Sequence, residues 1–223
     1  MTPRIDTFVL GDYQTNCHVV TIPDDPQCEG KCWIVDCGYG PQEMIEAISA
    51  QGLQPQSIFL THCHSDHIAG IDDAMARFGP LSVTCHVSEE AWNMTPELNL
   101  SGYSGRDVRV TPPDRLITGG ESVTMGSTSW DVVHAPGHSP GCVLFVHEPS
   151  QTILAGDTLF AGSIGRCDFP TADPEAHRQT ITMMMEFDDS YRVLPGHGPE
   201  TTIGKERQTN PFVINGMLRA AWG

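Results

Sequence analysis

The chain has 223 residues, of which 39% are hydrophobic, with 22 glycines and 17 prolines. This length allows a full-sized buried core in one domain, and the composition excludes disordered and fibrous proteins. Twelve Lys and Arg stand against 28 Asp and Glu, and the formal charge of −16 repels phosphate backbones and anionic lipids, so we expect neither nucleic acid nor a membrane as a partner.

The chain begins with Met1–Asp6, which lacks a basic region followed by an apolar core. No apolar run approaches the roughly 20 residues needed to span a bilayer. Eight cysteines are scattered along a chain too large to need disulfides, and we interpret them as reduced thiols in the cytoplasm. Cys28 and Cys32 are more typical of packing or free thiols than of a metal site, because a lone pair at this spacing is a weak signal.

Apolar runs bounded by turn residues predict the first elements. Three strands over 7–10, 17–22 and 32–36 form an antiparallel meander, and a helix follows between Pro41 and Gly52. The next run predicts a buried strand over 58–60, and the one after it an amphipathic helix over 68–78 that ends at Gly79-Pro80.

The second half of the chain alternates again. A strand over 81–87 and a helical turn over 89–94 precede a long loop over 95–109, which either walls a site or is an ordinary surface excursion. Four hairpin-like strands are then predicted, over 122–125, 130–134, 143–146 and 152–155. A helix that begins at Asp173, a strand over 191–194 and a last amphipathic segment over 212–218 follow.

The most informative stretch is residues 61–67, which places three histidines and one aspartate in six consecutive positions. Alternation in an extended chain turns His62 and His64 to the same side. Asp66 and His67 belong to the following turn and point in another direction, and two such pairs suit two adjacent metal ions better than one. The alternative is a histidine-rich surface loop, which the position at a strand end disfavours.

One pattern recurs at four strand ends: an apolar strand, then small or turn-forming residues, then a side chain that can bind a metal. Strand ends of this kind gather ligands where open sites form, and glycine before a ligand lets the backbone approach closely. Seven ligands are too many for one tetrahedral ion and fit two ions if one carboxylate bridges them. The predicted metal ligands are His62, His64, Asp66, His67, His138, Asp157 and His197.

These motifs resemble those of the metallo-β-lactamase-fold hydrolases over nearly the whole chain. The resemblance implies an α+β fold, a four-layer αβ/βα sandwich in which two mixed β-sheets pack face to face with helices outside. Within that superfamily, residues 156–170, 196–199 and 209–212 resemble the small glyoxalase II-like (hydroxyacylglutathione hydrolase-like) branch. Residues 1–223 are then expected to be a single domain without the C-terminal glutathione-binding helical domain of larger glyoxalase II enzymes.

The resemblance also implies roles for the ligands and a reaction. One divalent metal ion would be held by His62, His64, His138 and Asp157, and a second by Asp66, His67, His197 and the bridging Asp157. Zinc is the expected metal, with iron or manganese as alternatives, because imidazole and carboxylate sites accept all three. The implied reaction is hydrolysis of a thioester such as S-lactoylglutathione by a hydroxide shared between the ions, with Asp66 and Asp157 as the catalytic carboxylates that balance charge and orient the water.

Other functions stay open. A persulfide dioxygenase has the same fold and motif but uses one iron with two His and one Asp, so that Asp66, His67 and His197 would have no ligand role. Lactonase, β-lactamase and nuclease activities also occur on this fold, and the alternative outside enzymes is a metal-binding sensor domain. Arg166 either binds a substrate carboxylate or pairs with Asp168. The expected partner is a small-molecule substrate, and the expected assembly a monomer or small homo-oligomer.

Overall fold

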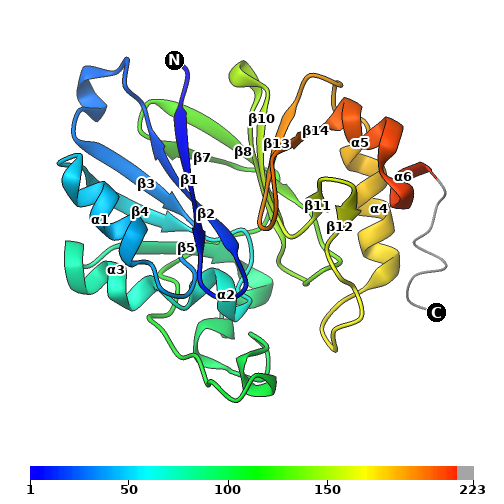
Figure 1. Ribbon diagram of the computed structural model, residues 1–223, viewed down its shortest axis with the longest axis horizontal. Helices are drawn as coiled ribbons and strands as arrows, with labels where there is room; N and C mark the ends of the chain where they lie inside the picture. The colour runs from blue at the N-terminus through cyan, green and yellow to red at the C-terminus, as the bar shows by residue number, and fades with distance from the viewer. Residues whose placement is uncertain (215–223) are drawn as a thin grey trace.

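A computed structural model describes residues 1–214 and contains two six-stranded β-sheets (Figure 1). The strands of the first sheet lie in the order of the chain: β1 (Arg4–Leu10), β2 (Thr15–Thr21), β3 (Lys31–Val35), β4 (Gln54–Phe59), β5 (Ser82–His86) and β6 (Arg115–Ile117). The pairs β1·β2 and β2·β3 are antiparallel, which confirms the predicted meander. From β3 to β6 the strands are parallel, so their carboxyl ends finish at the same edge.

The second sheet is also mixed. Its order across the sheet is β14 (Thr201–Thr202), β13 (Arg192–Pro195), β10 (Thr152–Gly156), β9 (Val143–His147), β8 (Thr128–His134) and β7 (Ser122–Met125). The predicted hairpins are present as antiparallel pairs from β7 to β10, and β13 then joins β10 in parallel. The register between β10 and β13 shifts between Leu154 and Gly156, just before the predicted ligand Asp157. A small β-hairpin, β11 (Leu159–Phe160) and β12 (Ser163–Ile164), follows this ligand.

Helices cover the outer faces of both sheets, as Figure 1 shows for α1 (Gln42–Ala50) and α3 (Ile71–Phe78) on one flank and for α4 (Pro174–Met184) and α5 (Ile203–Thr209) on the other. The inner core lies between the sheets, where Phe59 meets Phe145 edge to face with ring centroids 5.7 Å apart. Two outer cores lie under the helices. Each large side chain fully buried in these cores contributes about 1.5–3 kcal/mol. Three cores between two sheets and two outer sets of helices confirm the predicted four-layer α+β sandwich.

The predicted helix over 68–78 is interrupted. Residues Ser65–Ile68 form a short helix, α2, and the chain restarts as α3 after Gly70. The amide of Gly70 donates to the carbonyl of Cys37 at 2.8 Å, and a side chain at this position would collide with the carbonyl of Gly38. The apolar pattern of the sequence continues through the break and does not reveal it. The break is set by the tertiary contact of Gly70 and not by local sequence.

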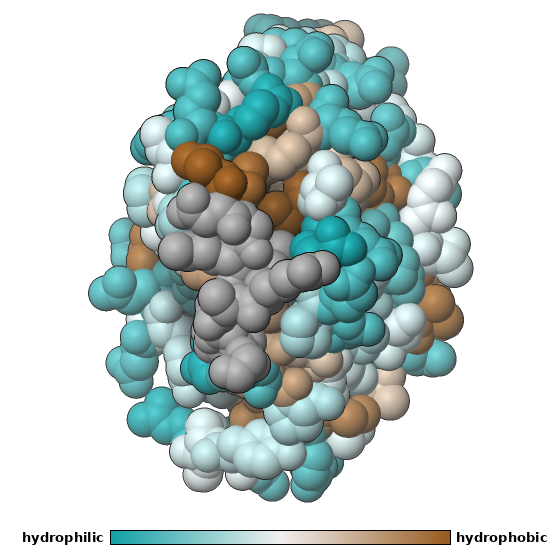
Figure 2. Space-filling view, turned by 90° about the vertical axis from the view of Figure 1, so that its right-hand side faces the viewer, coloured by the Kyte–Doolittle hydropathy of each residue, from teal (hydrophilic) through white to brown (hydrophobic). Residues whose placement is uncertain are grey.

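The long loop after β5 contains short 3-10 helices: η2 (Val87–Glu89), η3 (Trp92–Met94) and η4 (Ser101–Tyr103). The short helix α6 (Pro211–Ile214) contains the start of the last amphipathic segment, predicted over 212–218, and the rest of that segment lies outside the described residues. Figure 2 looks onto the flank of α4, α5 and α6, where apolar side chains gather at the surface. Phe212 and Val213 pack against the outer core of the second sheet.

All eight cysteines are buried and free. Among residues 1–214, no helix has both the length and the apolar character needed to cross a bilayer.

Candidate metal centre

The predicted ligands converge at one edge of the sandwich, where strands of both sheets end. His62 follows β4, His138 follows β8, Asp157 follows β10 and His197 follows β13, each within four residues of the strand end. Because the ends of these strands meet at the same edge, segments more than a hundred residues apart in the chain deliver side chains to one place.

The first group of side chains contains three buried histidines, His62, His64 and His138, whose ligand atoms lie within 4.8 Å of one another. Nδ1 of His64 and Nε2 of His138 are 2.8 Å apart. Nε2 of His62 and Nε2 of His64 are buried and have no hydrogen-bond partner among the described residues. Buried polar atoms are normally paired, so the orphaned Nε2 of His62 fits a bound cation, whereas His64 turns its Nδ1 towards His138.

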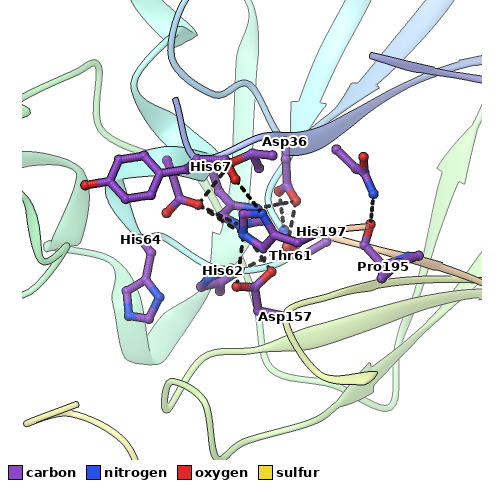
Figure 3. Close-up of polar contacts among 12 residues, drawn as sticks. Asp36, Thr61, His62, His64, His67, Asp157, Pro195 and His197 are labelled. Atoms are coloured by element: carbon purple, nitrogen blue, oxygen red, sulfur yellow. Dashed lines mark hydrogen bonds and ion pairs between the residues drawn. The ribbon is translucent and has the colours of Figure 1, made fainter. Parts of the chain in front are cut away.

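The second group consists of Asp66, His67 and His197, and it also meets within 4.8 Å. Oδ2 of Asp66 lies 3.6 Å from Nε2 of His67 and 3.2 Å from Nε2 of His197. Asp157 lies between the groups, 3.3 Å from Nε2 of both His67 and His197 (Figure 3). It also lies 3.5 Å from Nε2 of His138. One carboxylate therefore contacts imidazoles of both groups, as a bridging ligand must. Asp66 and His67 both lie in α2 and not in the predicted turn.

Asp36 is a buried residue of the site that the sequence interpretation missed. Its Oδ2 lies 2.9 Å from Nδ1 of His67 and accepts from the Thr61 hydroxyl at 2.7 Å, while its Oδ1 accepts from the Thr61 amide at 2.8 Å (Figure 3). A carboxylate in this position holds the proton on Nδ1 and turns the Nε2 lone pair towards the site. Asp36 follows an apolar strand just as Asp157 does, and the strand-end pattern could have found it.

The hairpin of β1 and β2 holds the loop of His197 in place. Nδ2 of Asn16 donates to the carbonyls of Pro195 and Gly198, both at 2.8 Å, and the amide of Asn16 donates to Gly196 at 2.7 Å. Gly196 packs directly against Asp157, and any side chain there would collide with Oδ1 of that carboxylate. Glycine is therefore required by the close approach of two strand ends.

The charges of the site shift its titration in opposite directions. Burial and the neighbouring imidazoles lower the pKa values of His62 and His64 well below the ordinary value. Burial acts in the same sense on His67 and His197, but adjacent carboxylates outweigh it and raise the pKa of His67 well above normal and that of His197 to about 10. Burial raises the pKa of Asp66, and the charge of His67 outweighs it and lowers this pKa to about 2. The second group thus puts protonated imidazoles among carboxylates, where a metal cation would bring the same compensating charge.

A cavity of about 640 Å³ opens onto both groups. The loop predicted over 95–109 contributes Leu100, Tyr103 and Ser104, so it does wall the site. Phe160 and Phe169 line other parts of the cavity. Mostly apolar walls with a few converging polar groups are typical of small-molecule sites.

Arg166 lines the cavity and is paired with Asp168 through two hydrogen bonds of 2.9 and 2.8 Å. Its guanidinium also lies over the ring of Phe169, 4.7 Å from the centroid. The backbone carbonyl of Arg166 lies 2.7 Å from Nδ1 of His138, so the cavity wall also orients a histidine of the first group.

A two-sheet sandwich with a His and Asp cluster at the edge of its sheets is typical of metallo-hydrolases. The sequence model of the Metallo-beta-lactamase superfamily matches residues 10–197, and the chain belongs to that superfamily. This family assignment confirms the resemblance predicted from the motifs.

Curated relatives match over nearly their full length. The probable metallo-hydrolase YqgX of Bacillus subtilis is 34% identical over 93% of this chain and 96% of its own. The hydroxyacylglutathione hydrolase GloC of Haemophilus influenzae is 31% identical over 94% of this chain and 98% of its own.

Two solved structures are similar in fold and sequence. The crystal structure of BLEG-1 B3 metallo-beta-lactamase has a TM-score of 0.88 and 34% identity, and the match covers 95% of this chain and all of that one. The structure of TTHA1623 in a di-iron-bound form has a TM-score of 0.79 and 31% identity, covering 93% of this chain and 99% of that one.

Proposed function

We propose that this metallo-hydrolase holds two divalent cations and hydrolyses thioesters of the S-lactoylglutathione type. The observation that carries the proposal is Asp157, whose carboxylate contacts imidazoles of both ligand groups. A pair of cations bound at this edge would lower the pKa of water and supply hydroxide near neutral pH. The substrate class is supported by the similarity to GloC.

The chain itself contributes orientation and charge. One ion would be bound by His62, His64 and His138 and the other by Asp66, His67 and His197, with Asp157 common to both. The Thr15 hydroxyl donates to Oδ2 of Asp66 at 3.0 Å and fixes the direction of that carboxylate. The apolar walls of the cavity restrict water around the reacting carbonyl, and Arg166 is proposed to orient a carboxylate of the substrate.

The metal is proposed to be zinc, with iron as the main competitor. Imidazole and carboxylate ligands accept both, and the similar structure of TTHA1623 is described with two irons. We also propose that the protein acts in the cytoplasm, where free thiols stay reduced, and that it is a monomer or small homo-oligomer.

The persulfide dioxygenase alternative is less well supported. It uses two His and one Asp for a single iron and leaves Asp66, His67 and His197 without a task. These three side chains meet within 4.8 Å and are linked to the first group by Asp157. The metal content distinguishes the two hypotheses, because the hydrolase is expected to hold two metal ions per chain and the dioxygenase one.

β-Lactam hydrolysis is a second candidate because BLEG-1, described as a B3 metallo-beta-lactamase, matches this chain over its whole length at 34% identity. The test is a panel assay on the purified protein with its metal content measured in the same sample. S-lactoylglutathione, other thioesters, a lactone and a cephalosporin are compared by kcat/KM. Preference for the thioesters supports the proposal, preference for the cephalosporin supports the second candidate, and a metal-loaded protein inactive on all four would contradict both.

A further inference from the structure

Glu89 is a fully buried carboxylate at the end of η2 that no step of the proposed function uses. All of the hydrogen bonds that it accepts come from uncharged donors. Oε2 accepts from the amide of Cys63 at 2.6 Å, and Oε1 accepts from the amide of Gly141 at 2.7 Å and from the hydroxyl of Ser139. Burial of a carboxylate is costly, and a chain that buries one needs these donors to stabilise the charge.

The three donors belong to the two loops that carry the first group of histidines. Cys63 lies between His62 and His64, and Ser139 directly follows His138. A single carboxylate from a third segment therefore joins the loop after β4 to the loop after β8. All three histidines of the group are within one residue of a donor to Glu89.

The second loop is shaped around this carboxylate. A side chain at Gly141 would lie 2.7 Å from both Cγ and Cδ of Glu89, so only glycine lets the loop pass this closely. Ser139 also lies 3.1 Å from the Cys142 sulfur, which fixes its hydroxyl beside Glu89. The contact is thus a built junction between two loops and not an incidental pairing.

We propose that Glu89 is a positioning residue that sets the separation of the two loops and thereby the affinity of the three-histidine group for a divalent cation. The inference rests on the metal centre proposed above. Metal ligands must be held within a few tenths of an ångström of their ideal distances, and a loop displaced by about 1 Å loses the site.

The test measures Co²⁺ affinity by visible absorption in two backgrounds that each retain one ligand group. His197→Ala keeps the three-histidine group, and His138→Ala keeps the second group. Glu89→Gln is then added to each, because a glutamine of the same shape offers one acceptor oxygen and places an N–H₂ against a backbone N–H. The matched control is Glu90→Gln, which removes the same charge from the exposed neighbouring residue.

The expected result is a loss of affinity of about 10- to 100-fold from Glu89→Gln in the His197→Ala background, the usual effect of removing a group that supports a ligand. In the His138→Ala background, the loss of Co²⁺ affinity from Glu89→Gln should stay below about threefold. Glu90→Gln should not change the Co²⁺ affinity in either background. Ser139→Ala removes one donor and keeps the carboxylate, so it should lower the Co²⁺ affinity of the three-histidine group by about 3- to 10-fold. This variant replaces Glu89→Gln in the test if Glu89→Gln does not fold.

Equal losses in both backgrounds would overturn the proposal, because they would report a general loosening of the fold. Unchanged Co²⁺ affinity in the His197→Ala background would also overturn it. If the unsubstituted protein binds no Co²⁺, the proposed metal centre itself is wrong. If it binds two ions and Glu89→Gln has no effect, only the role of Glu89 is wrong.

Discussion

Replacement of Asp36 by Asn tests how the site orients His67. The backbone of Asp36 has a φ of +60°, which asparagine tolerates well, so the substitution adds no strain. In the present geometry Oδ1 accepts from the Thr61 amide, and Oδ2 faces Nδ1 of His67. Asparagine keeps one acceptor for the Thr61 amide and turns its N–H₂ towards His67. In the neutral imidazole, which is the form that binds a cation, Nδ1 must then become the acceptor, and the proton lies on Nε2, the nitrogen that faces Asp66 and Asp157.

The magnitude follows from this change of tautomer. An imidazole that carries a proton on Nε2 cannot bind a cation with that atom until the tautomer is restored. Loss of a supporting carboxylate typically reduces metal affinity by 10- to 100-fold, which is about 1.4–2.7 kcal/mol. The expected loss falls on the ion bound by the second group.

The assay is competition for Zn²⁺ with a chromophoric chelator, and it resolves the weaker of the two bound ions. Asp72→Asn is the matched control, since Asp72 also accepts from a threonine amide and hydroxyl, those of Thr111, but is exposed on α3. The control should bind both ions as the unsubstituted protein does. Asp36→Asn that retains both affinities would refute the argument that Asp36 sets the tautomer of His67.

Further predictions concern metal content, pH and substrate binding. His197→Ala should reduce bound metal from two ions to one per chain, measured by elemental analysis. Because the pKa of His67 is raised well above normal and that of His197 to about 10, metal binding near neutral pH should release about two protons, and affinity should fall as pH is lowered; calorimetry in buffers of different ionisation enthalpy counts these protons. Burial lowers the pKa of His18 from 6.5 to about 4. The free energy of unfolding should therefore fall by about 3 kcal/mol as the pH is lowered from 6.5 to 4, because only the unfolded state takes up the proton in this range. His18→Gln should flatten this pH dependence, measured by urea unfolding. Arg166→Ala should raise KM about tenfold at constant kcat if it only binds substrate, whereas Arg178→Ala, which removes an exposed arginine of α4, should change neither constant.

The strand-end pattern predicted side chains that the structure brings together, because the pattern depends on local chemistry. Ligand types, their spacing and the period of two in residues 58–64 are visible in the sequence alone. The convergence of His138, Asp157 and His197 on the first motif followed from the strand ends and is present in the structure. The role of each as a metal ligand stays a prediction.

The groups that support the ligands were not predicted. Asp36 had a signal in the sequence, its position at a strand end, but that signal was missed. Asn16 and Pro195 are in contact although they lie 179 residues apart in the chain, and no local pattern links them. Glu89 resembles any other acidic residue of a short helix until its burial between two loops is known. The break before α3 was missed for the same reason, since the contact of Gly70 with Cys37 is tertiary.

The sequence by itself determined the alternation of strands and helices, the family resemblance and the chemistry of the side chains, because these depend on residue type and near neighbours. Only the tertiary structure decided which nitrogen each imidazole presents, which side chains support the ligands and which carboxylates set their charge. Those properties depend on distances of about 3 Å between distant segments, and such distances are set by the packing of the two sheets.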